Sequence, residues 1–158
     1  HTAGAVYTCL IIPESQYLPK AVAEFLKKLV LNEKPKYLWL LTTYGSTTGQ
    51  IARFTDEILA SKGLKLHGSF CVKMPDTWTP IFDLSNKETV AVINKNAEPQ
   101  IDEIIQKIQQ KSSGNFMRNK LPKFVAPSYK PYYENMRKTK HFTVDDSCIG
   151  CRLCEKMG

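Results

Sequence analysis

The chain has 158 residues, of which 42% are hydrophobic, and this is enough for the core of one domain with a short appendage. No run approaches the roughly 18 uninterrupted apolar residues of a membrane span and no signal segment opens the chain, so we expect a cytoplasmic protein without a membrane-spanning part. The formal net charge of +7 arises between Lys111 and Lys140, where eight basic residues accompany one acid, Glu134.

Apolar strands alternate with amphipathic helices from the start of the chain. Residues 5–12 form an apolar run that predicts a buried strand, and residues 13–17 form the loop that leaves it. Apolar side chains then recur at helical spacing over residues 18–29, with Pro19 in the first turn. Residues 37–41 are apolar without alternation, which is typical of a strand covered on both faces of a parallel sheet.

Two further helices and one strand follow. A helix begins near Ile51 and ends at Gly63. Residues 64–73 alternate apolar with polar side chains, and this predicts an edge strand whose solvated face carries the polar ones, including His67 and Ser69. A third helix is expected up to residue 108.

The third helix has a start signal and an interruption. Ser85 and Glu88 have the spacing of a capping box, in which each side chain bonds the other's backbone amide. Pro99 lies in the middle of the apolar stripe and must kink the helix or restart it, because proline has no amide hydrogen to donate.

The order strand, helix, strand, helix, strand, helix predicts a doubly wound parallel α/β sheet, with the first two helices on one face and the third on the other. An apolar first strand is a poor outer edge, so we expect a further strand and helix that precede His1. We place the α/β domain at residues 1–113, a basic strap at 114–142 and a cysteine segment at 143–158. The strap interleaves tyrosines with its basic residues, and Pro122, Pro127 and Pro131 favour an extended conformation.

The loop after the second strand is a candidate ligand site. Residues 42–50 contain two glycines, four threonines and a serine, whose amides and hydroxyls can approach a ligand closely. In open α/β sheets the ligand crevice lies beyond the carboxyl ends of the strands, where this loop falls. An ordinary strand-to-helix turn explains the same residues equally well.

The five cysteines form two single residues and one cluster. Cys9 and Cys71 lie in expected strands and are interpreted as buried small residues. Cys148, Cys151 and Cys154 have the spacing of the first three ligands of a bacterial ferredoxin run, C-x2-C-x2-C-x3-C-P, and this favours iron and sulphur over zinc. Gly158 stands at the fourth position of the pattern, so a further ligand must come from elsewhere.

Taken together, several stretches resemble one family, the two-part proteins in which a flavodoxin-like domain precedes a ferredoxin domain with paired four-iron clusters. The most specific are Val72-Lys-Met-Pro-Asp76 and Cys148-Ile-Gly-Cys-Arg-Leu-Cys-Glu-Lys156; residues 18–25, 37–49 and 62–66 add to them. The resemblance implies a flavodoxin-like sheet of order 2-1-3-4-5, of which the strands here are the third, fourth and fifth. The first strand and its phosphate loop are then absent from this sequence.

The resemblance also implies two cofactors. Flavin mononucleotide (FMN) would lie between the loops after the first two strands, and a 4Fe-4S cluster would be held by Cys148, Cys151 and Cys154. Trp78 and Tyr44 could flank the flavin ring, although aromatic side chains at such positions pack into cores as often. The full set of candidate FMN residues is Pro13, Glu14, Ser15, Tyr17, Thr42, Thr43, Tyr44, Gly45, Ser46, Thr47, Gly49 and Trp78.

A rival interpretation takes Gly45-Ser-Thr-Thr-Gly49 as the phosphate loop itself, with residues 37–41 as the first strand. The match at Lys73-Met-Pro-Asp76 argues against it. Under either interpretation the loop contacts flavin.

The expected function is electron transfer between flavin and iron-sulphur clusters, in which the chemistry belongs to the cofactors because no nucleophile and base are paired in the sequence. The basic strap would attract an acidic redox partner, and we do not expect nucleic acid as a partner; a solvated tail explains the same basic residues. The sequence is also compatible with a homodimer. One alternative is a cofactor-less binding module that acts through the strap, and another is a flavin-dependent reductase of a small substrate.

Overall fold

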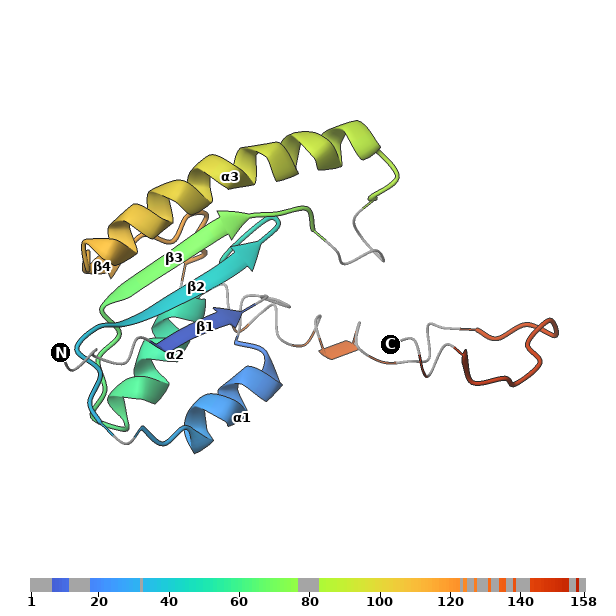
Figure 1. Ribbon diagram of the computed structural model, residues 1–158. Coiled ribbons are helices and arrows are strands. Elements are labelled where there is room, and N and C mark those ends of the chain that lie inside the picture. Colours follow the sequence, from blue (N-terminus) through green and yellow to red (C-terminus); the bar gives the residue numbers. More distant parts are fainter. Residues whose placement is uncertain are drawn as a thin grey trace.

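The computed structural model describes residues 7–11, 18–31, 33–76, 83–122 and 143–153, together with residues 124, 127, 131, 134, 135, 138 and 156. For residues 7–11 only the backbone is described. These residues form a parallel β-sheet with helices on both faces, followed by the cysteine segment (Figure 1).

The sheet has three strands of ordinary length and one very short strand. They are β1 (Tyr7–Ile11), β2 (Leu38–Tyr44), β3 (Gly68–Lys73) and β4 (Gly114–Asn115). The spatial order is β1-β2-β3-β4 and every pair is parallel. A parallel α/β class is therefore confirmed, and the sheet is compatible with a flavodoxin-like fold.

The helices divide between the two faces as the strand order predicts. Helices α1 (Lys20–Lys28) and α2 (Ile51–Ala60) lie side by side on one face, and α3 (Lys87–Gln109) covers the other (Figure 1). Leu26, Leu38 and Leu59 pack together beneath α1 and α2. The core on the opposite face is rich in aromatic side chains, and it gathers Tyr37, Trp39, Phe70, Val72, Ala97 and Ile104. Apolar burial of this kind on both faces fixes the parallel sheet.

Helix α2 ends where the sequence predicts. Gly63 has a φ of 68°, in the left-handed region that glycine enters without a steric penalty. Its amide donates to the Ala60 carbonyl at 2.9 Å, and the Leu64 amide reaches back to the Leu59 carbonyl at 3.0 Å. These bonds satisfy carbonyls that the helix end would otherwise leave unpaired.

The prediction of a half-solvated edge strand at residues 64–73 is wrong. The strand begins only at Gly68, its residues 68–72 are all buried, and β4 pairs with it on the outer side. Ser69 is 4% exposed. His67 is half-buried, and its Nδ1 accepts a hydrogen bond from the Leu38 amide at 3.0 Å. The alternation misled because the residues after Gly114 return to cover this edge.

Helix α3 differs from prediction at its start. Asn86, not Ser85, is the N-cap, and its Oδ1 accepts from the Thr89 amide at 2.9 Å. The helix does not restart at Pro99 but continues as a single element of 23 residues (Figure 1). Ala97 and Ile104, on either side of the proline, are both buried, so packing supports the helix before and after Pro99.

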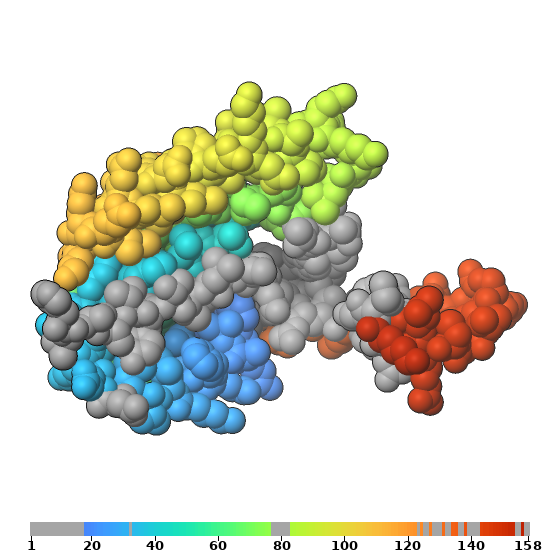
Figure 2. All heavy atoms as spheres, in the orientation of Figure 1, coloured from blue at the N-terminus to red at the C-terminus, as the bar shows by residue number. Residues whose placement is uncertain are grey.

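The cysteine segment stands apart from the α/β body. Residues 143–153 are all exposed, and in Figure 2 they project to one side of it. Among the helices that the structure describes, none combines the length and the apolar character needed to cross a membrane.

Candidate cofactor sites

The first candidate site lies where β2 ends, and the strand runs further than predicted. Thr42, Thr43 and Tyr44 belong to β2 and not to the loop. Thr42 is fully buried, and Tyr44 is 5% exposed in a core cluster with Cys71 and Met117. Burial raises the pKa of the Tyr44 phenol. Tyr44 is therefore a core residue in this conformation and does not present a free ring face.

The strand-end loop, residues 45–50, receives a carboxylate at its entrance. Ser46 Oγ donates to Asp76 Oδ2 at 3.4 Å. Gly45 permits this approach, because a Cβ at position 45 would lie only 2.3 Å from Asp76 Oδ2. The negative charge disfavours a phosphate group at Gly45 and Ser46, which argues against the rival phosphate-loop interpretation.

The same loop is bonded to a short part of the basic strap, which we call the strap segment, residues 118–121. Thr47 Oγ1 donates to the Asn119 carbonyl at 2.6 Å, and Thr48 Oγ1 donates to the Arg118 carbonyl at 2.6 Å. The Thr48 amide also donates to the Asn119 carbonyl, at 3.3 Å. The Gln50 side-chain amide donates to the Leu121 carbonyl.

The loop's two threonine hydroxyls are thus occupied by the chain itself. Thr47 Oγ1 additionally accepts from the Gly49 amide at 3.0 Å, and Gly49 forms a parallel bridge with Lys120. In this conformation the strand-end loop does not offer these groups to a flavin. Thr48, which is 1% exposed, has a central part in this contact that sequence reasoning missed. Nothing in the loop's own sequence indicates acceptors that lie 70 residues further along the chain.

Several candidate residues lie outside the described part of the chain. For FMN these are Pro13, Glu14, Ser15, Tyr17 and Trp78, and for the cluster Cys154. The structure therefore brings together Gly45, Ser46, Thr47 and Gly49 at the carboxyl end of β2.

The second candidate site is the cysteine segment. Cys148 and Cys151 are exposed, and Gly150 between them has a φ of 66°, which bends the backbone. Before them, Asp145 organises a turn: its carboxylate accepts from the Ser147 amide at 3.0 Å and from the Ser147 hydroxyl, and its carbonyl accepts from the Cys148 amide at 3.1 Å. The two Ser147 bonds hold the pKa of Asp145 below its usual value.

Thiolate donors of this kind suit iron or zinc. Within the described residues no group of three or more His, Cys, Asp or Glu side chains is gathered closely enough to hold a metal ion. The donor set nevertheless fits a cluster in its chemistry, because Cys148 and Cys151 are accessible and the backbone turns between them.

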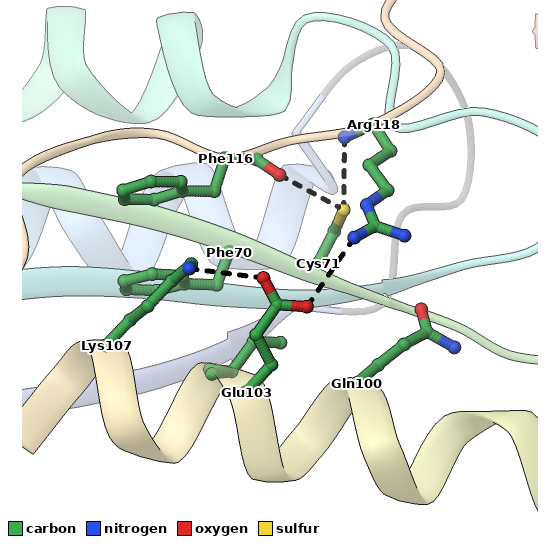
Figure 3. A pocket seen from close by; sticks show the side chains of 8 residues that line it. Phe70, Cys71, Gln100, Glu103, Lys107, Phe116 and Arg118 are labelled. Atoms are coloured by element: carbon green, nitrogen blue, oxygen red, sulfur yellow. Dashed lines mark hydrogen bonds and ion pairs between the residues drawn. The ribbon is translucent and has the colours of Figure 1, made fainter.

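A small cavity of about 160 Å³ opens beside β3, between α3 and the start of the strap (Figure 3). The Arg118 amide donates to Cys71 Sγ at 3.2 Å, and Glu103 pairs with Lys107 at 3.1 Å and with Arg118 at 3.7 Å. Burial raises the pKa of the Cys71 thiol, which therefore stays protonated near neutrality. Its lining is Phe70, Cys71, Gln100, Glu103, Ile104, Lys107, Phe116 and Arg118. The prediction that Cys71 is a buried small residue is confirmed.

These observations define a small parallel α/β protein that carries an exposed cysteine segment. Comparison of the chain with protein-family models, with curated proteins and with solved structures found no match.

Proposed function

We propose that this protein transfers single electrons, with an iron-sulphur cluster held by Cys148, Cys151 and Cys154 as one redox group and FMN at the strand-end loop as the other. The observation that carries the proposal is the even two-residue spacing of three cysteines, two of which lie on an exposed, turned segment. A cluster, when bound, supplies one-electron chemistry.

The chain's own residues serve this role in three ways. Cys148 and Cys151 provide soft anionic sulphur, and the turn at Asp145 fixes the backbone that leads into Cys148. Ile149 is 87% exposed and Leu153 is 60% exposed, so apolar side chains alternate with the cysteines and can shield bound iron and sulphur from water. The exposed position of the segment allows a redox partner to approach closely.

The flavin part of the proposal rests on the resemblance and on the place of the strand-end loop at the carboxyl end of a parallel sheet. The excess of basic residues between Lys111 and Lys140 supports an acidic protein as the redox partner. Thr47 and Thr48 would become available to a flavin only when the strap segment leaves them.

The test of the cluster is anaerobic reconstitution of the full chain with ferrous iron, sulphide and a small thiol that can serve as a fourth ligand. We expect bound iron and sulphide and a broad visible absorption that bleaches on reduction. Cys148→Ser and Cys151→Ser should each lose most of the bound iron. Cys71→Ala is the matched control, because it removes a thiol outside the segment and should retain the cluster.

Two results would reject the cluster: a chain that stays colourless after reconstitution, or one in which Cys71→Ala loses as much iron as Cys148→Ser. Stoichiometric zinc binding without iron would point to a structural metal site instead.

A second candidate function is a binding module without flavin, and one observation favours it: the hydroxyls of Thr47 and Thr48 are already bonded within the chain. Such a module would bind its partner through the basic strap. Binding of arbitrary single-stranded oligonucleotides that weakens steeply with salt, by a chain that takes up neither FMN nor iron, would favour this function over electron transfer.

A further inference from the structure

The strap is attached to the α/β domain in two different ways. Its first residues are anchored by strand pairing and by apolar contacts: β4 pairs with β3, the Phe116 ring stacks on Phe70 with centroids 5.2 Å apart, and Met117 is 6% exposed. Over residues 118–122 the side chains are exposed or half-buried, and hydrogen bonds from the strand-end loop hold residues 118–121. The part of the strap that is held by strand pairing and apolar contacts therefore ends where the strap segment begins.

The bonds that hold the strap segment have a common pattern. On the strap side the acceptors are main-chain carbonyls, those of Arg118, Asn119 and Leu121. On the loop side the donors are Thr47, Thr48 and Gln50, which follow the carboxyl end of β2. The strap segment thus presents a row of acceptor oxygens to the donors that a ligand of this loop would use.

Asn119 adds a local strain to this arrangement. Its φ of 50° lies in the left-handed region, where a non-glycine residue is uncommon, although asparagine tolerates it better than most. Its side-chain amide donates to the Ser46 carbonyl at 3.4 Å. The contact with the loop compensates for a backbone conformation that Asn119 would leave if the strap segment detached.

We propose that the strap segment is a displaceable cover of the strand-end loop, which competes with FMN for Thr47 and Thr48, so that flavin binding and strap release are linked. This inference rests on the proposed flavin site. The described conformation is the covered state. Because linkage is reciprocal, FMN should release the strap segment by the same factor by which a loosened strap segment tightens FMN binding.

The test uses two substitutions at Asn119, on the strap side of the contact. Asn119→Pro forbids the positive φ and should detach the strap segment, whereas Asn119→Gly allows that φ and keeps the main-chain acceptors. FMN affinity is measured by quenching of FMN fluorescence, and strap release by the rate of trypsin cleavage after Lys120. That bond is usable in all three chains, since a proline at position 119 would block only cleavage after Arg118.

We expect Asn119→Pro to bind FMN at least tenfold more tightly than the unsubstituted chain and to be cleaved after Lys120 at least tenfold faster. Asn119→Gly should stay within about threefold of the unsubstituted chain in both measurements. In the unsubstituted chain, saturating FMN should itself accelerate cleavage after Lys120, and this measurement needs no variant.

Equal FMN affinity in the unsubstituted chain and Asn119→Pro, or slower cleavage of the unsubstituted chain with FMN, would overturn the competition while leaving the flavin site intact. Absence of FMN binding in all three chains would overturn the flavin site and the competition together. The two failures are therefore distinguishable.

Discussion

Thr48 donates its side-chain hydroxyl to the carbonyl of Arg118 over 2.6 Å, although the two residues are 70 positions apart in the chain. Thr48 is 1% exposed, so water cannot replace this bond while the structure is closed. The bond joins the end of β2 to the strap, and the strap segment is in this sense part of the α/β domain. We predict a boundary between the α/β domain and the strap at residue 114. In the structure, residues 114–121 contact the domain directly, so this boundary stays a prediction.

Replacing Thr48 by valine should lower the free energy of unfolding by about 1–3 kcal/mol. The substitution keeps the shape of the side chain and leaves the Arg118 carbonyl without its buried partner. Urea unfolding followed by circular dichroism would measure the change. Thr47→Val is the matched control: its bond to the Asn119 carbonyl is exposed, so water can replace it, and we expect a loss below about 1 kcal/mol. Equal losses in the two variants would contradict a buried bond at Thr48.

Asn86→Ala should destabilise α3 by about 1 kcal/mol, because it removes the side-chain acceptor for the Thr89 amide. Ser85→Ala should change the free energy of unfolding by less than about 0.5 kcal/mol, since the Ser85 hydroxyl donates to Asp83 on the exposed surface. Urea unfolding of both variants separates the two assignments. A larger loss in Ser85→Ala would restore the capping box that the sequence predicts.

Much of the fold follows from pattern. Unbroken apolar runs predict β1 and β2 because a central parallel strand is buried on both faces. Apolar residues at helical spacing predict α1 and α2 because a helix on a sheet buries one face. The order of the elements then predicts which helices share a face. The N-cap of α3 was misplaced by one residue because Ser85 and Asn86 are both good caps, and only the backbone decides between them.

The candidate site was much less predictable. The hydroxyls of Thr47 and Thr48 could be recognised as donors, but their partners are main-chain carbonyls, which every residue possesses and no pattern marks. The burial of β3 could not be foreseen either, because the residues that cover its outer edge are distant in sequence. They are β4 and Met117, which follow a 23-residue helix. The burial of Tyr44 beneath Met117 is a consequence of the same return of the chain.

Pro99→Ala should stabilise the protein by about 2–2.5 kcal/mol. The alanine restores an amide donor inside α3, a gain of about 3 kcal/mol, and part of it is offset because the unfolded chain becomes more flexible. Glu98→Ala, at the neighbouring exposed position, should change stability by less than about 0.5 kcal/mol. Thermal and urea unfolding would measure both. A loss of stability in Pro99→Ala would mean that a proline-induced bend is needed to bury Ala97 and Ile104 together.

Stability should fall at alkaline pH, and Cys71 should account for part of the fall. Burial raises the pKa of the Cys71 thiol above its ordinary value of 9.0. Below that value the thiol is protonated in both the folded and the unfolded chain, so it contributes no pH dependence. As the pH rises past it, the unfolded thiol loses its proton and the folded thiol keeps it, so the unfolded state falls in free energy relative to the folded state and the free energy of unfolding decreases. The buried Tyr44 phenol acts in the same direction above its ordinary value of 10.0.

The measurement is the free energy of urea unfolding at a series of pH values between about 8 and 10.5, under anaerobic and reducing conditions. We expect the free energy of unfolding to fall with pH in the unsubstituted chain and to fall less steeply in Cys71→Ala. The substitution also enlarges the cavity beside β3, which lowers the stability of Cys71→Ala at every pH. Comparing slopes removes the cavity term, which does not depend on pH. Parallel slopes in the two chains would show that the Cys71 thiol ionises as readily in the folded protein as in the unfolded one, and that the cavity admits enough water to hydrate a thiolate.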